Sequence, residues 1–189
     1  MKPAFEEVYD QHYDDVWRFL LHAAADVTAA LDLTSQTFFR AYRAWPRFRP
    51  DAPVKSWLLR IAVNEWRREL RRRKLARVFP MSDKLESDDL APSLEPSEVE
   101  SVVSEIERHE SYLMLHRAIA RLPQKYSTPI MLRYFEHMSI NEVADVLKRP
   151  VGTVKSLIHR GIARLQEDQG LREAHGESII EVSELTVES

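Results

Sequence analysis

The chain has 189 residues, with 27 basic and 30 acidic side chains and no cysteine. This length predicts one or two small domains rather than a large enzyme, and the lack of cysteine excludes a disulfide framework, a thiolate zinc site and a cysteine nucleophile. No glycine-rich phosphate-binding motif is present. Because the first residues do not form a signal peptide and no apolar run is long enough to cross a bilayer, we expect a cytoplasmic protein without direct membrane insertion.

Helical periodicity accounts for the first part of the chain. Apolar side chains recur at spacings of three and four over residues 4–24, which predicts an amphipathic helix. A second helix is expected from a cap at Thr28 to about Trp45. Three prolines between residues 46 and 53 then predict a short, stiff loop.

A third helix, expected over residues 54–74, has one apolar face and one polar face. On a helical wheel the polar row falls within an arc of about 80°. It contains Arg60, Asn64, Arg67, Arg71 and Lys74. Guanidinium groups suit phosphates and base edges, so this row favours nucleic-acid binding. Phe48, in the loop before the helix, either stacks on a base or packs in the core, and the pattern favours neither.

The composition changes after the third helix. Residues 79–110 hold 10 acidic and 2 basic side chains, whereas residues 40–78 hold 13 basic and 3 acidic ones and residues 111–168 hold 9 basic and 5 acidic ones. With its serines and prolines, the acidic segment predicts a linker. Two basic segments favour a polyanion bound at two places, although most charge runs are only solvated helix faces.

Residues 139–168 carry the pattern of a second helical element. Ser139 to Glu142 predict a capping box that opens one helix, and a turn at Pro150 leads to another helix from about Gly152. The polar face of that last helix holds Thr153, Lys155, Ser156, His159 and Arg160. Periodicity alone favours a merely structural hairpin, but this polar set shifts the balance toward a helix-turn-helix reader of the major groove.

The expected fold is therefore all-α, with two small helical modules joined by an acidic flexible linker. We place the modules at residues 1–76 and 108–168, the linker at 77–107 and an acidic C-terminal extension at 169–189.

Several segments resemble conserved regions of bacterial sigma factors. Residues 32–34 (Asp-Leu-Thr), 48–53 (Phe-Arg-Pro-Asp-Ala-Pro) and 56–62 (Ser-Trp-Leu-Leu-Arg-Ile-Ala) are similar to the second region. Residues 132–136 (Leu-Arg-Tyr-Phe-Glu) and 152–156 (Gly-Thr-Val-Lys-Ser) are similar to the fourth. Both regions occur in order, with no room for the third, which is the layout of the extracytoplasmic-function (ECF) sigma factors. The resemblance implies a region 2-like helical bundle and a region 4-like helix-turn-helix.

This resemblance implies a specificity subunit rather than an enzyme. Such a protein binds core RNA polymerase, directs promoter recognition and melting, and initiates transcription of a specific regulon. It is expected to need no metal, cofactor or small-molecule substrate. Its implied partners are promoter DNA, the clamp helices and flap of core polymerase, and an anti-sigma factor that can hold it at the membrane.

The resemblance also implies three sets of site residues. The set that docks on the clamp helices is Asp32, Leu33, Phe38 and Tyr42. The set that binds the minus-ten element is Phe48, Arg49, Asp51, Lys55, Arg60, Asn64, Arg67 and Arg71. The set that reads the minus-thirty-five element is Thr153, Lys155, Ser156, His159 and Arg160.

Two other functions are weighed against this one. A metal enzyme is disfavoured because His109 and His116 are separated by about 10 Å of helical rise, too far for one ion. A stand-alone helix-turn-helix repressor accounts for residues 139–168 but leaves the basic row of the third helix without a role. One local alternative stays open: either Thr128 caps a shortened helix that begins at Pro129, or the helix continues through Pro129 with a kink.

Overall fold

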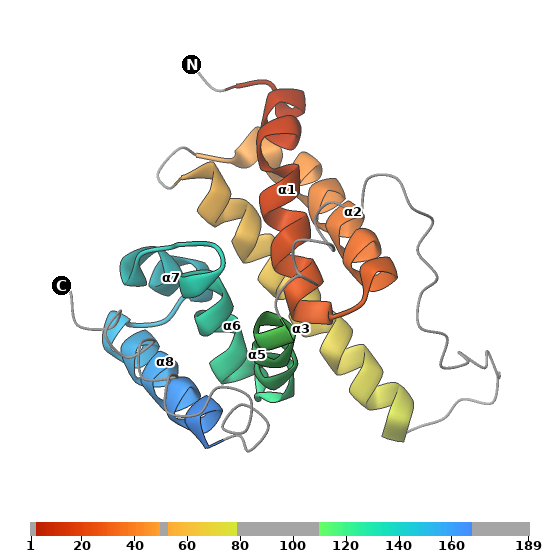
Figure 1. Cartoon of the computed structure of the whole chain (residues 1–189). Coiled ribbons are helices and arrows are strands. Elements are labelled where there is room, and N and C mark those ends of the chain that lie inside the picture. The colour runs from red at the N-terminus through yellow and green to blue at the C-terminus, as the bar shows by residue number, and fades with distance from the viewer. Residues whose placement is uncertain (1–2, 50–52, 79–109, 168–189) are drawn as a thin grey trace.

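A computed structural model of the chain describes residues 3–49, 53–78 and 110–167, and within these ranges every regular element is helical (Figure 1). The N-terminal module consists of α1 (Phe5–Ala24), α2 (Val27–Ala44), the short 3-10 helix η1 (Trp45–Arg47) and α3 (Val54–Val78). The C-terminal module consists of α5 (Glu110–Arg121), α6 (Gln124–Tyr134), α7 (Ile140–Leu147) and α8 (Val151–Gln166). The all-α expectation is confirmed. The acidic extension, and all but the first two residues of the expected linker, lie outside the described ranges.

A tight connection joins α1 to α2. Ala25 adopts a left-handed conformation with φ of 51°, and its N–H donates to the carbonyl of Leu21. Asp26 then caps α2, because its carboxylate accepts a hydrogen bond of 2.9 Å from the N–H of Ala29. The expected cap at Thr28 is therefore wrong: Thr28 already lies in the first turn of α2.

The three long helices of the N-terminal module pack around an apolar centre. Its largest fully buried side chains include Phe19 and Leu20 from α1 and Leu58 and Leu59 from α3. Trp66 is also buried, as expected of its apolar face. Helix α3 ends at Val78 rather than at residue 74, so its basic C-terminal part is longer than expected.

Helix α6 continues through Pro129. Its N-cap is Pro123, and Thr128 and Pro129 lie buried within the helix. The alternative of a shortened helix capped by Thr128 is therefore wrong. Since proline has no N–H, the helix loses one backbone hydrogen bond at this position.

The helix-turn-helix is built as the sequence predicts. Ser139 Oγ accepts from the N–H of Glu142 at 3.2 Å, and the Glu142 carboxylate accepts from the N–H of Ser139 at 2.8 Å, so the capping box is confirmed. Lys148 ends α7 with φ of 54°, and α8 begins at Val151. Gly161 allows α8 to approach α6, because a Cβ at this position would lie 2.6 Å from Cδ1 of Ile130.

The two modules lie against each other. Helix α3 packs on α7, and α1 packs on α5 and α6 (Figure 1). The buried apolar residues of both modules belong to one continuous cluster. We call this the closed arrangement, and it brings the polar face of α3 next to the C-terminal module.

Candidate nucleic-acid interface

The residues expected on α2 divide between core and surface. Asp32 and Tyr42 are exposed, but Leu33 and Phe38 are 3% and 4% exposed. The Phe38 ring lies against Tyr9 at a centroid distance of 4.7 Å. Leu33 and Phe38 therefore hold α2 on the module, while the predicted role of this set in binding polymerase stays a prediction.

Two other apolar side chains of α2 face solvent. Leu31 is 44% exposed and Phe39 is 62% exposed, close to the 60% of Tyr42. The family motif drew attention to Leu33 and Phe38 instead, whereas the 3.6-residue period is the signal that separates the two sides of α2. The exposed apolar surface of α2 therefore consists of Leu31, Phe39 and Tyr42, with Asp32 beside it.

Phe48 belongs to an aromatic cluster. Its ring is stacked on Trp45, with centroids 4.9 Å apart and planes 10° apart, and its centroid lies 4.8 Å from that of Trp57. Of the two alternatives, the structure favours packing for this ring. Arg49 is exposed next to the cluster, whereas Asp51 lies outside the described residues.

The arginines of α3 differ in whether a carboxylate meets their charge. Arg68 pairs with Glu65 at 2.8 Å, and Arg72 and Arg73 pair with Glu69 at 2.8 and 2.7 Å. The polar row expected from the sequence behaves differently. Across the described ranges, Arg60, Arg67 and Arg71 have no carboxylate partner. Asn64, in the same row, is exposed.

The row is partly covered in the closed arrangement. Asn64 and Arg71 are exposed, while Arg60 and Arg67 are half-buried. Burial lowers the pKa of Arg67, and the nearby charges of Arg149 and Arg71 act in the same direction. Arg149 belongs to the turn before α8, so two basic regions from different modules meet here.

Lys55 lies between the two modules. Its ammonium group donates to Asp15 Oδ1 at 3.0 Å and pairs with Glu136 Oε2 at 3.3 Å. Burial alone would raise the pKa of Asp15, but the hydrogen bonds from Lys55 and His12 outweigh it and the pKa is lowered. Glu136 is more deeply buried, and burial raises its pKa in spite of Lys55. The expected DNA contact at Lys55 is thus occupied by carboxylates in this arrangement.

The polar face of α8 is open. Val154, Ile158, Gly161 and Leu165 are buried against the rest of the C-terminal module. The five predicted contacts all lie on the exposed side: Thr153, Lys155, Ser156, His159 and Arg160. Hydroxyl, ammonium, imidazole and guanidinium groups therefore stand together on the helix that follows the turn.

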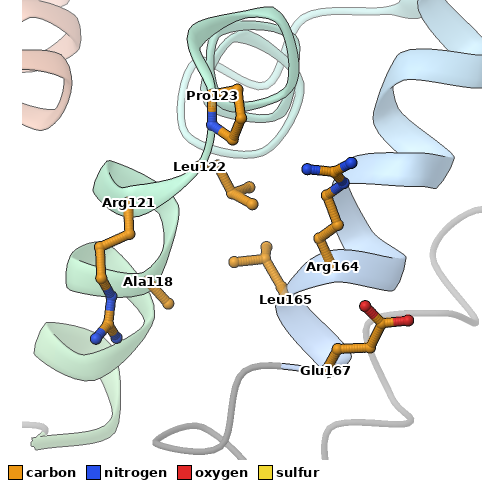
Figure 2. A pocket seen from close by; sticks show the side chains of 7 residues that line it. All are labelled: Ala118, Arg121, Leu122, Pro123, Arg164, Leu165 and Glu167. Carbon is orange, nitrogen blue, oxygen red and sulfur yellow. The ribbon is translucent and has the colours of Figure 1, made fainter.

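A cleft of about 360 Å³ lies elsewhere in the C-terminal module, between α5 and the end of α8. Figure 2 shows Leu122 and Leu165 in its middle, with Arg164 and Glu167 on the α8 side. None of the predicted site residues lines this cleft.

The described part of the chain contains no group of three or more histidine, aspartate or glutamate side chains placed to hold a metal ion. None of its helices has the length and apolar character needed to cross a membrane.

Comparison with known proteins gives consistent matches. The family model "Sigma-70 region 2" matches residues 8–76, and "Sigma-70, region 4" matches residues 112–165. The chain is 33% identical to the RNA polymerase sigma-H factor of Pseudomonas aeruginosa, over 90% of this chain and 88% of that protein. It is 29% identical to the ECF RNA polymerase sigma factor SigW of Bacillus subtilis, over 87% and 88% of the two chains.

Two solved structures share the fold. One is the sigma factor RpoE in complex with the anti-sigma factor NepR from Bartonella quintana, with a TM-score of 0.63, 21% identity, and 86% and 94% of the two chains covered. The other is CnrH in complex with the cytosolic domain of CnrY, with a TM-score of 0.60, 24% identity, and 86% and 85% covered.

Proposed function

Since the chain belongs to the extracytoplasmic-function sigma factors of bacterial RNA polymerase, we propose that α2, α3 and α8 divide its work among polymerase, melted DNA and duplex DNA. As a sigma factor it directs core polymerase to promoters and initiates transcription there. We infer that it does so as a specificity subunit and not as an enzyme.

One observation carries the assignment of α3. Its arginines separate into a group neutralised by Glu65 and Glu69 and a group without carboxylate partners among the described residues. The second group includes Arg67 and Arg71 and shares one face with Asn64. Unpaired guanidinium groups gain most from phosphate, so this face is the one that binds the melted minus-ten strand.

The loop before α3 completes this region. We assign Phe48, Arg49 and Asp51 to the neighbourhood of an unstacked base, with Arg49 as the exposed cation and the aromatic cluster as its support. We assign Lys55 and Arg60 to the same contact; separation of the modules would remove Glu136 from Lys55 and leave Asp15, in its own module, as its carboxylate partner.

Helix α8 is assigned to the minus-thirty-five element as duplex. Its five exposed polar side chains follow a capped helix and a tight turn, which is how a recognition helix enters the major groove. Thr153, Lys155 and Ser156 lie in its N-terminal half, where base edges are usually contacted, and His159 and Arg160 follow one turn later.

The exposed apolar surface of α2 is assigned to core polymerase. Leu31, Phe39 and Tyr42 offer aromatic and aliphatic area of the kind that dominates protein interfaces, and Asp32 adds a charge beside them. We propose the clamp helices of the largest subunit as its target and the polymerase flap as a contact of the C-terminal module. An anti-sigma factor is proposed as the regulator, as in the RpoE–NepR and CnrH–CnrY complexes. The proposed location is the cytoplasm, or the membrane surface when such a regulator is anchored there.

Promoter opening tests this assignment. Promoters are selected from a randomised library with core polymerase and the chain, and unpaired thymines are then mapped by permanganate. We expect melting at the minus-ten element only when both proteins are present. The chain alone is the control. A helix-turn-helix repressor would instead bind the duplex by itself, and adding polymerase would not produce melting.

A further inference from the structure

Three rings from the two modules meet between α1 and α5–α6. The centroid of His22, on α1, lies 4.5 Å from that of His116, on α5, and 4.7 Å from that of Phe135, which ends α6. His116 and Phe135 are themselves stacked, with centroids 4.7 Å apart and planes 11° apart. The three rings therefore form one contact across the boundary between the modules.

Both histidines are held in the neutral form. His22 is 8% exposed, and burial lowers its pKa to about 3, with His116 and Arg18 acting in the same direction. Burial lowers the pKa of His116 to about 4. Two imidazolium ions at this distance would repel each other in a poorly solvated place.

The charge of Arg18 acts against protonation of His22. Arg18 is itself positive, and its guanidinium group already pairs with Asp15 at 3.3 Å. Lys55 forms a second ion pair with Asp15 and also pairs with the buried Glu136. A proton on His22 thus adds positive charge near Arg18, whose carboxylate partner Asp15 is shared with Lys55.

We propose that the contact of His22 with His116 and Phe135 is a proton-sensitive closure, which holds the two modules together at neutral pH and releases them on acidification. In the released form both imidazoles reach water and regain their ordinary affinity for protons.

The sign and size follow from proton linkage. The closed form binds fewer protons than the open form, so closure is fully favourable above the ordinary histidine pKa of about 6.5 and weakens as pH falls below it. Between pH 7.5 and 5.5 the closing equilibrium constant should fall by up to about tenfold for each histidine, and up to about 100-fold for the pair. Glu136 opposes this change, because its raised pKa means that closure at lower pH is favoured by proton uptake there.

The consequence of closure for transcription rests on the proposed function, whereas the closure itself does not. It holds Lys55 between two carboxylates and leaves Arg60 and Arg67 half-buried. Release takes Glu136 away from Lys55 and Arg149 away from Arg67, while Asp15 stays with Lys55 in the N-terminal module, so acidification increases the fraction of chain that is ready to open a promoter.

The closure is tested by fluorescence energy transfer on the full chain. Because the sequence has no cysteine, dyes can be placed at two introduced cysteines, Gln11→Cys in α1 and Gln166→Cys in α8, both at exposed positions. We expect a single-molecule population of low transfer efficiency to grow between pH 7.5 and 5.5. A second pair within the N-terminal module, Gln11→Cys with Ser35→Cys, should stay constant and so separates opening from unfolding.

Two variants identify the groups responsible. With His22→Phe and His116→Phe together, the rings and their packing are kept and the pH response should disappear. With Glu136→Gln, the opposing group is removed and the response should steepen. The proposal is overturned if the original chain does not open over this range, if the double phenylalanine variant opens in parallel, or if the pair within the N-terminal module changes at the same pH. None of these readouts requires polymerase or DNA, so failure here is distinct from failure of the proposed function.

Discussion

Adjacent arginines on α3 stand in different electrostatic situations. Arg72 shares the carboxylate of Glu69 through two hydrogen bonds of 2.8 and 3.0 Å, whereas Arg71 is exposed and lacks a carboxylate partner among the described residues. The two side chains carry the same charge and differ mainly in direction. This pair therefore offers a matched test of which face of α3 meets DNA.

We predict that Arg71→Ala weakens promoter opening and that Arg72→Ala does so much less. Each lost phosphate contact on single-stranded DNA should lower the slope of log K against log salt concentration by about 0.7. Titration of holoenzyme on the promoter at several salt concentrations measures this slope. Equal losses in the two variants would show that α3 acts through its total charge rather than through one face.

The buried and exposed apolar residues of α2 allow a second comparison. Phe39→Ala removes a solvent-exposed ring, so we expect the free energy of unfolding to change by less than about 0.5 kcal/mol. Binding of the Phe39→Ala variant to core polymerase should weaken roughly fivefold or more, as expected when a side chain that anchors an interface is removed. Leu33→Ala creates a cavity and should cost about 2–5 kcal/mol of stability. Thermal unfolding and a polymerase binding titration measure the two effects, and unchanged binding of Phe39→Ala would remove this side chain from the interface.

At the scale of single helices, two glycines of α8 show how packing decides the effect of one methyl group. A Cβ at Gly161 would lie 2.6 Å from Ile130 Cδ1 and 3.2 Å from Tyr126 Cβ, whereas a Cβ at Gly152 meets nothing within 4 Å. We predict that Gly161→Ala is less stable than Gly152→Ala by about 1–3 kcal/mol, since both gain helix propensity but only one is overpacked. Denaturant unfolding of both variants measures the difference. Equal stability would mean that Ile130 moves aside at little cost.

Local patterns predicted most helices but not all of their ends. The capping box at Ser139 and the division of α8 into buried and polar sides follow from hydrogen-bonding side chains and a 3.6-residue period, and both are found. The cap of α2 was misplaced at Thr28, because Asp26 and Thr28 are both good capping residues and only the backbone conformation distinguishes them. Pro129 shows the converse, since packing keeps a helix intact where the local rule disfavours it.

The polar faces of α3 and α8 were predictable from helical periodicity, but the exposed side of α2 and the contacts between the modules were not predicted. Asn64 and Arg71 lie exposed on the predicted row, whereas Arg67 is half-buried, and its pKa is lowered by burial and by the charge of Arg149 in the turn before α8. The contact of His22 with His116 joins residues far apart in the sequence. No periodicity reports such a contact, because it depends on how the modules pack.

At the scale of the whole molecule, the closed arrangement conflicts with simultaneous use of both DNA-binding faces. Lys55 is engaged with Asp15 and with Glu136 of the C-terminal module, and Arg67 is half-buried, with the charge of Arg149 from the turn of the helix-turn-helix acting on it. We predict that addition of core polymerase and promoter DNA at pH 7.5 lowers the transfer efficiency between dyes at positions 11 and 166. The chain alone at the same pH is the control. If transcripts are initiated while the transfer efficiency stays at the value of the closed arrangement, α3 acts without release from α7.

The openness of α8 in the closed arrangement has a consequence for the order of events. Its polar side stays in solvent while part of the α3 row is withheld. We therefore expect a closed molecule to bind upstream duplex through α8 first and to bind the separated strand through α3 only afterwards. The search along a genome and the breaking of base pairs would then be successive steps that do not compete.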